Sequence, residues 1–459
     1  MQLREYQTKL IDAARESFGR GNKFPLIVAP TGSGKTVLFS AFTKGIVAKG
    51  NSVLILAHRI ELLEQISKTL VKFNLSHSVI APNYPDYPND RVHVGSVFTC
   101  ARRELKNYDV VIIDEAHHCI GASTFGKVIA RVNPKWRLGV TATPCRLSGE
   151  PLGEMFDDLI LGPTTRELIN QNHLSDYRIF APGNVSLAGV HTRGGDFVTA
   201  EIESAMDKPA ITGSAINEYK KHADGKRALV FCTTIKHAEN VRDQFIAAGY
   251  RAENLDGTMD SKTRSAVVSK FTTGETQVLT SVNVVSEGFD LPAIEVAILL
   301  RPTQSTSLYL QQVGRALRIF PGKTQAIILD HAGNTARHGL PCSERVWSLT
   351  SKIKPVKASE SSPSVKICEK CFAAQESGKP QCIFCGFVFP IKQRLLEEIE
   401  GDLAEIDVAK FRIKKKIENV RAQTKEQLVE LARARGYKNP HGWAHFIYQA
   451  RMRKRLGMR

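Results

Sequence analysis

One short stretch constrains this chain more than any other, and it directly follows the apolar run at residues 25–28. It reads Ala29-Pro30-Thr31-Gly32-Ser33-Gly34-Lys35-Thr36, the A-x-x-x-x-G-K-T spacing of a phosphate-binding loop. Glycines in such a loop let successive backbone N–H groups point at phosphate oxygens. The lysine supplies positive charge to the β- and γ-phosphates, and the threonine hydroxyl can bind Mg²⁺. The helix expected next directs its positive dipole end at the same anion. The stretch therefore predicts a nucleoside triphosphate site, with an ordinary glycine-rich turn as the alternative.

Short apolar runs recur along the chain up to residue 330, and stretches with helical spacing lie between them. Runs without polar alternation suit strands buried on both faces, and helical crossovers suit a parallel sheet. The series occurs twice. We therefore expect an α/β protein with two doubly wound parallel-sheet domains in tandem, at residues 1–207 and 208–350.

Two acidic residues, Asp114 and Glu115, come directly after the apolar run at residues 110–113. Sites in doubly wound sheets lie beyond the carboxyl ends of the strands. A carboxylate there can hold Mg²⁺, so we expect Asp114 to share the metal with Thr36. Glu115 points elsewhere on the turn and is the candidate base that orients and deprotonates a water molecule.

Four of the nine cysteines form two pairs, Cys368-x-x-Cys371 and Cys382-x-x-Cys385. Two such pairs supply four thiolates for a tetrahedral Zn²⁺, and a four-cysteine site has no open position for catalysis. We expect a structural zinc module at residues 366–390, preceded by a polar, proline-containing linker at residues 351–365. A disulfide pair is the alternative.

The net charge of +17 is concentrated at the end of the chain: residues 410–459 carry fifteen Lys/Arg against three Asp/Glu. A basic segment on a nearly neutral body is typical of a nucleic-acid binder, although a solvated surface is the alternative. We expect residues 391–459 to be a basic helical tail. No run is long enough to span a membrane, and the first residues lack the apolar stretch of a signal peptide, which favours a cytoplasmic protein.

The order of the motifs resembles superfamily 2 helicases of the DEAD/DEAH-box type. The loop is followed by Asp114-Glu115-Ala116-His117, by Thr141-Ala142-Thr143-Pro144 and by Gln311-Gln312-Val313-Gly314-Arg315-Ala316-Leu317-Arg318. The resemblance implies two RecA-like domains, a small zinc ribbon and a basic helical C-terminal region. It also implies that Arg4 and Gln7, in an element whose glutamine reads adenine in that family, bind ATP.

The second half adds Ser286-Glu287-Gly288-Phe289-Asp290, which resembles motif V and implies nucleotide binding by Gly288 and Asp290. The run at residues 311–318 resembles motif VI, whose arginines reach the γ-phosphate when the cleft between the domains closes. Arg315 and Arg318 are therefore expected to be catalytic beside Lys35. Gln312 stands where many DEAH proteins have arginine, but both other arginines are present.

Residues 301–334 resemble bacterial RadD-type DNA-repair helicases, and a zinc segment after the motor fits that branch, so we expect a bacterial or phage-encoded protein. The resemblance implies an ATP-dependent helicase or translocase that uses ATP and Mg²⁺, with structural Zn²⁺. Nucleic acid, with DNA favoured, and replication or repair proteins are the implied partners, in a bacterial or phage-infected cell. Two alternatives stay open: the motor of a restriction or defence enzyme, and a nucleic-acid-binding protein that ATP switches without unwinding.

Overall fold

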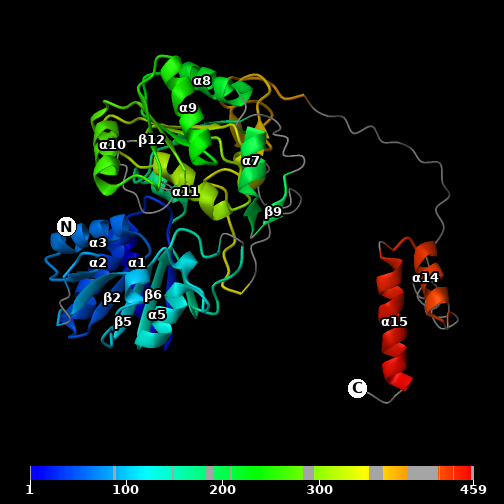
Figure 1. The fold of residues 1–459 in the computed structure, drawn as a ribbon, viewed down its shortest axis with the longest axis horizontal. Coiled ribbons are helices and arrows are strands. Elements are labelled where there is room, and N and C mark those ends of the chain that lie inside the picture. The colour runs from blue at the N-terminus through cyan, green and yellow to red at the C-terminus, as the bar shows by residue number, and fades with distance from the viewer. Residues whose placement is uncertain are drawn as a thin grey trace. The chain divides into compact units, whose positions relative to one another are not determined.

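A computed structural model of the chain describes residues 2–85, 89–146, 149–181, 190–193, 195–206, 209–282, 294–350, 365–390, 422, 424–437 and 439–455. The chain divides into two compact units, Met1–Pro390 and Ile391–Arg459 (Figure 1). No helix of the described residues has both the length and the apolar character that crossing a bilayer requires.

A seven-stranded parallel sheet forms the core of the first domain, in the order β3-β4-β2-β5-β6-β1-β7. Its strands are β1 (Pro25–Val28), β2 (Val53–Ala57), β3 (Ser78–Ile80), β4 (Val92–Ser96), β5 (Val110–Asp114), β6 (Trp136–Thr141) and β7 (Asp158–Leu161). The helices are α1 (Glu5–Gly19), α2 (Lys35–Ala48), α3 (Ile60–Lys72), α4 (Val97–Cys100), the 3-10 turn η1 (Ala116–His118), α5 (Thr124–Val132) and α6 (Thr165–Asn170). The central strands β1, β2 and β5 are buried along their whole length, as continuous apolar runs predict.

The second domain contains a six-stranded parallel sheet in the order β12-β13-β11-β14-β15-β8. Its strands are β8 (Tyr177–Phe180), β11 (Ala228–Phe231), β12 (Ala252–Leu255), β13 (Val278–Ser281), β14 (Val296–Leu299) and β15 (Ala326–Asp330). The other elements are a hairpin of β9 (Thr192–Arg193) and β10 (Asp196–Phe197), and the helices α7 (Thr199–Met206), α8 (Pro209–Ala223), α9 (Ile235–Ala247), α10 (Ser261–Thr273), α11 (Thr306–Ala316) and α12 (Asn334–His338). Two tandem RecA-like α/β domains are thus confirmed.

The change from one sheet to the other does not coincide with the expected boundary at residue 207. β8 pairs with β15, so the chain enters the second sheet between β7 and β8. After the second sheet, Trp347 and Leu349 pack against the core of the first domain, and the carbonyl of Leu349 accepts a hydrogen bond of 2.9 Å from the N–H of Gly153. The second sheet therefore includes β8, which the sequence analysis assigned to the first domain. The core of the first domain in turn contacts Trp347 and Leu349, which were assigned to the second.

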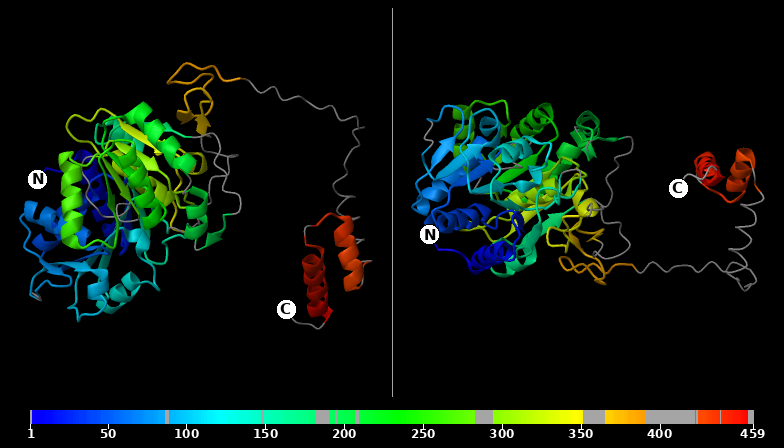
Figure 2. Two further views of the ribbon diagram at one scale, coloured as in Figure 1. Left: turned by 45° about the horizontal axis from the view of Figure 1, so that its top comes forward. Right: turned by 90° about the horizontal axis from the view of Figure 1, so that it is seen from below.

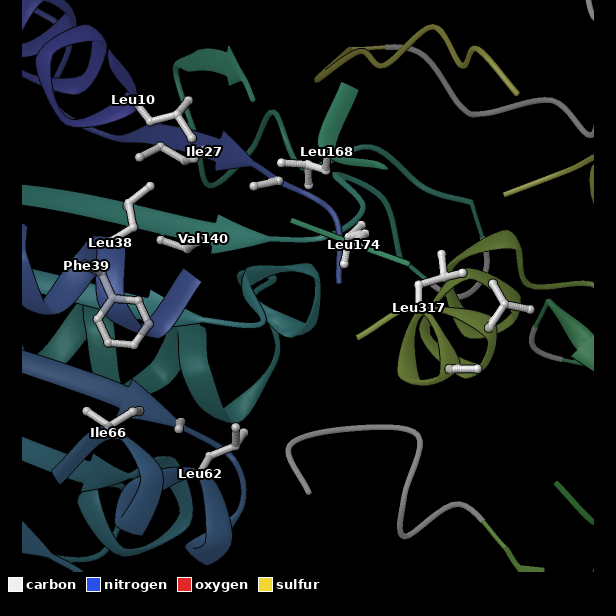
Figure 3. Packing of buried hydrophobic residues seen from close by; sticks show 14 of the residues in the cluster. Leu10, Ile27, Leu38, Phe39, Leu62, Ile66, Val140, Leu168, Leu174 and Leu317 are labelled. Atoms are coloured by element: carbon white, nitrogen blue, oxygen red, sulfur yellow. The ribbon is translucent and has the colours of Figure 1, made fainter. Parts of the chain in front are cut away.

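The hydrophobic core continues from one domain into the other. Figure 3 shows Leu168 and Leu174 between Val140 of the first sheet and Leu317, which follows α11 of the second domain. All four side chains belong to one cluster of buried residues. This continuity places α11 directly beside the loop that follows β1.

The segment at residues 365–390 folds as a short antiparallel pair, β16 (Val365–Ile367) with β17 (Ala374–Glu376). It attaches to the second domain at β8, where the N–H of Ala181 donates to the carbonyl of Phe372 at 3.0 Å and Phe180 pairs with Ala373.

The second unit contains α14 (Lys425–Ala434) and α15 (Pro440–Arg455), the orange-red and red helices that lie side by side in both views of Figure 2. They pack against each other through Leu428, Val429 and Ala444. Thr424 and Gln427 form a capping box at the start of α14. Of the expected basic helical tail at residues 391–459, residues 391–421, 423, 438 and 456–459 lie outside the described residues.

Candidate active site between the domains

The loop after β1 has the backbone conformation that its glycines were expected to permit. Gly32 and Gly34 have φ of +86° and +75°, in the left-handed region that favours glycine. A Cβ on Gly32 would lie 2.9 Å from Leu174, and one on Gly34 would lie 2.7 Å from the side-chain amide of Gln7. Neither position has room for a side chain. Lys35 is then the first residue of α2, so the loop closes on the N-terminus of that helix.

Side chains of α1 hold the backbone of the loop through hydrogen bonds. The Gln7 side chain is 3% exposed, and its Nε2 donates to the carbonyl oxygens of Ser33 and Gly34 at 3.2 and 3.3 Å. Its Oε1 accepts the backbone N–H of Arg4 at 3.0 Å, and the Tyr6 hydroxyl donates to Ser33 O at 2.5 Å. Gln7 is therefore built into the scaffold of the loop, while its contact with adenine stays a prediction.

The two acids at the end of β5 lie in different environments. Asp114 is 3% exposed; burial first, and then the charge of Glu115, raise the pKa of its carboxyl to about 7, although Lys35 acts to lower it. A buried carboxyl with raised pKa beside the loop is a suitable oxygen ligand for a divalent cation, since a cation there offsets the cost of its charge. Glu115 adopts φ of +49°, rare for a residue with a long side chain, which turns it away from the strand direction.

A chain of polar contacts leads from Glu115 to the second domain, and it begins with the carboxylate Oε2 of Glu115, 3.5 Å from the ring Nδ1 of His117. The ring Nδ1 of His117 lies 3.1 Å from the hydroxyl of Thr141, which donates to the carbonyl of Thr143 at 3.0 Å. The Thr143 hydroxyl lies 2.5 Å from the hydroxyl of Ser307, in the first turn of α11.

The helix α11 brings the two predicted arginines to the loop. Gly314 packs so closely that a Cβ there would lie 2.6 Å from Cβ of Thr31, and the stem of Arg318 lies beside Gly32. Arg315 is buried, at 4% exposed. Lys323 holds the turn that follows α11, because its ammonium donates to the carbonyls of Arg318 at 2.8 Å, Ile294 at 3.0 Å and Ala316.

These elements enclose one hollow, hereafter the interdomain hollow, lined by both domains. Its lining residues are Thr31, Gly32, Gly34, Lys35, Thr36, Leu62, Gln65, Asp114, Glu115, Arg315 and Arg318. Nine of them were predicted. Leu62 and Gln65 of α3 were missed, and their only sequence signal is the helical spacing after β2. Pro30 lines a second cavity on another side of the loop, and Gly288 and Asp290 lie outside the described residues.

The four clustered cysteines converge as their spacing predicts. All their Sγ atoms lie within 4.8 Å of one another, with Cys368 to Cys385 at 3.6 Å and Cys371 to Cys382 at 3.7 Å. A tetrahedral zinc with bonds of about 2.3 Å separates its sulfur ligands by about 3.8 Å, so the donor set fits zinc. The other five cysteines are not in disulfides, and only Cys342 among them is not buried.

Two RecA-like domains with a phosphate-binding loop and arginines facing one hollow define a two-domain ATPase. Family models agree: residues 1–146 match "Type III restriction enzyme, res subunit" and residues 208–320 match "Helicase conserved C-terminal domain". A "51.5 kDa protein" of a Lactococcus phage is 33% identical over 395 residues, covering 84% of both chains. The chain belongs to the superfamily 2 helicases and is an ATPase of that family.

Two other matches are more distant. The "Putative ATP-dependent helicase IRC3" of Saccharomyces cerevisiae is 30% identical over 72% of this chain, which spans about half (51%) of that relative. The fragment structure of "a putative HsdR subunit of a type I restriction enzyme" from Vibrio vulnificus has a TM-score of 0.57 and 22% identity, covering 72% of this chain and 64% of that one. That last likeness concerns the fold alone.

Proposed function

We propose that this protein is an ATP-dependent DNA helicase or translocase that acts in replication, recombination or repair in a bacterial or phage-infected cell. The observation that carries the proposal is the interdomain hollow: Lys35 and Glu115 of one domain and Arg315 and Arg318 of the other line it together. ATP bound there would connect the two domains, so its hydrolysis would change how they are held together.

In this proposal each lining residue of the first domain has a separate task. Lys35 and the N-terminus of α2 bind the β- and γ-phosphates of ATP. Thr36 and Asp114 hold Mg²⁺, which when bound neutralises phosphate charge. Glu115 orients a water molecule and removes its proton. Gln7 and Arg4 bind the adenine end.

The second domain supplies positive charge to the transition state. Arg315 and Arg318 lie on or next to α11, so they act on ATP when α11 rests against the loop, as the close approach of Gly314 to Thr31 permits. An arginine supplied in this way accelerates phosphoryl transfer by about 10³–10⁵. The Thr143–Ser307 contact connects the same helix to the segment after β6. We propose that this contact couples ATP hydrolysis to the domain movement that displaces the protein along nucleic acid.

DNA is our proposed substrate for two reasons. The family model that matches the first domain describes a restriction enzyme subunit, and the basic tail supplies charge for phosphate contacts. The cysteine module has the ligand set of a closed structural zinc site, so we assign it zinc and no catalytic role.

The same family model favours one second candidate, a motor subunit of a restriction or defence nuclease. Co-purification with a nuclease would support it. A strand-displacement assay with blunt, forked and tailed duplexes, run beside an ATPase assay, separates a helicase from a protein that ATP only switches. ATP turnover without displacement or translocation would contradict our main proposal.

Two variants test the division of labour within the hollow. Lys35→Ala should nearly abolish ATP hydrolysis and leave nucleic-acid binding intact. Glu115→Gln should also stop hydrolysis but keep ATP bound, because it removes the base and retains the shape of the side chain. Turnover near wild type for Lys35→Ala, or equally weak ATP binding by both variants, would refute the assignment.

A further inference from the structure

An ion pair joins the two domains beside the interdomain hollow. The carboxylate of Glu61, in the first turn of α3, pairs with the guanidinium of Arg264, in the first turn of α10. In Figure 1, α3 of the first domain and α10 of the second lie at the junction between the domains. The two side chains are 30% and 20% exposed, so water only partly screens their attraction.

Arg264 is held in place by its own domain. The second nitrogen of the Arg264 guanidinium donates to the carbonyl of Met259 at 3.0 Å. Asp260 caps α10 by accepting the N–H groups of Lys262 and Thr263 at 2.9 and 3.0 Å. Because these contacts already hold the Arg264 guanidinium, it loses little side-chain entropy when it pairs with Glu61.

The pair is next to residues that line the hollow. Leu62 and Gln65 follow Glu61 on α3, and they face the same hollow as Arg315 and Arg318. A movement of the second domain that takes Arg264 away from Glu61 would therefore also move Arg315 and Arg318 relative to Leu62 and Gln65. The pair also differs in kind from the other contacts between the domains described above, since Thr143–Ser307 is a neutral hydrogen bond and Gly314–Thr31 is a steric contact.

We propose that Glu61 and Arg264 are positioning residues that act as a charge latch between the domains. The latch stabilises the closed arrangement in which Arg315 and Arg318 reach ATP, so it favours ATP binding and hydrolysis without touching the nucleotide. The inference rests on the proposed function, because it assumes that closure is what places the arginines.

Charge exchange tests the latch in the full-length protein without nucleic acid. Glu61→Arg and Arg264→Glu each place like charges opposite each other, and each should raise KM for ATP and lower kcat by about three- to tenfold. The double variant Glu61→Arg/Arg264→Glu restores opposite charges and should recover most of the loss. In the wild type, raising the salt from 0.1 to 1 M should raise KM, and the gap between wild type and the single variants should shrink.

Lys270→Glu is the matched control. Lys270 pairs with Glu253 at 2.9 Å inside the second domain, so this reversal breaks an ion pair of the same kind without crossing between domains. It should leave KM and kcat near wild type, and thermal melts of all variants should show intact folding.

Single variants with wild-type KM and kcat would overturn the latch, as would a double variant no better than the worse single one. Loss of DNA affinity in Arg264→Glu, with unchanged KM in Glu61→Arg, would assign Arg264 to a phosphate contact and also overturn it. These failures are separate from a failure of the proposed function, which Lys35→Ala with retained turnover would reveal.

Discussion

The contact between Gly314 and Thr31 gives a direct test of whether the arginines must be placed to within an ångström. Gly314→Ala introduces a Cβ 2.6 Å from Cβ and 3.0 Å from Cγ2 of Thr31. Carbon atoms normally approach to about 3.5–4.0 Å, so α11 must move by roughly 1 Å. Arg315 lies on the same helix and Arg318 follows it, so both move with it.

A displacement of this size is costly for catalysis. Misplacing a reacting group by about 1 Å can lower the rate about 10²-fold, which corresponds to about 2.7 kcal/mol of barrier. We therefore expect Gly314→Ala to lower kcat of the ATPase about a hundredfold. Binding of ATP to the loop of the first domain should change much less, because that domain is unaltered.

Folding stability should fall only modestly, since the crowding against Thr31 costs about 1–3 kcal/mol and alanine in place of glycine inside a helix returns about 0.5–1 kcal/mol. Gly45→Ala is the matched control: Gly45 also lies inside a helix, α2, and a Cβ there would meet only the end of the Arg15 side chain, at 3.5 Å. It should keep wild-type kcat. Adding Thr31→Gly to Gly314→Ala removes the opposing Cβ and should recover part of the rate. A kcat for Gly314→Ala within twofold of wild type, in a folded protein, would refute the reasoning.

Three further predictions concern the cysteine module, the turn after α11 and the basic tail. Purified protein should contain one zinc per chain by elemental analysis, and Cys382→Ser should remove it. Lys323→Met should lower kcat about tenfold or more by releasing the turn that carries Arg318, while ATP affinity measured with a non-hydrolysable analogue stays within about twofold. Deleting residues 391–459 should weaken DNA binding at every sequence and flatten its salt dependence by about 0.9 in log–log slope per lost phosphate contact, with a similar maximal ATPase rate. Unchanged affinity and slope would instead assign that segment to protein docking.

The residues of the hollow that the sequence predicted share one property: each belongs to a short motif whose members lie close together along the chain. The lining residues of the loop, from Thr31 to Thr36 without Ser33, and the pair Asp114 and Glu115 belong to short motifs whose geometry is local. The apolar runs likewise identified most central strands, because strands buried on both faces cannot tolerate polar alternation. Their order in each sheet, by contrast, depends on contacts between distant segments.

The features that the sequence did not reveal are all long-range. β8 contains an arginine, Arg178, and its partner β15 comes far later in the chain, so nothing local assigns it to the second sheet. Leu62 and Gln65 have ordinary helical spacing, and only the arrangement of the sheet turns them toward the hollow. The pairing of Glu61 with Arg264 depends on the packing of two domains.

The attachment of the cysteine module to β8 has a consequence for how the protein behaves without metal. β8 is the last strand of its sheet, with β15 on one side, and on the other side Phe180 pairs with Ala373 of the module. The module thus covers a backbone edge of the second domain. An uncovered edge strand offers unpaired N–H and C=O groups to other chains, which is a common route to aggregation. Chelation should therefore produce turbidity that increases with protein concentration, and the metal would protect the solubility of the whole motor.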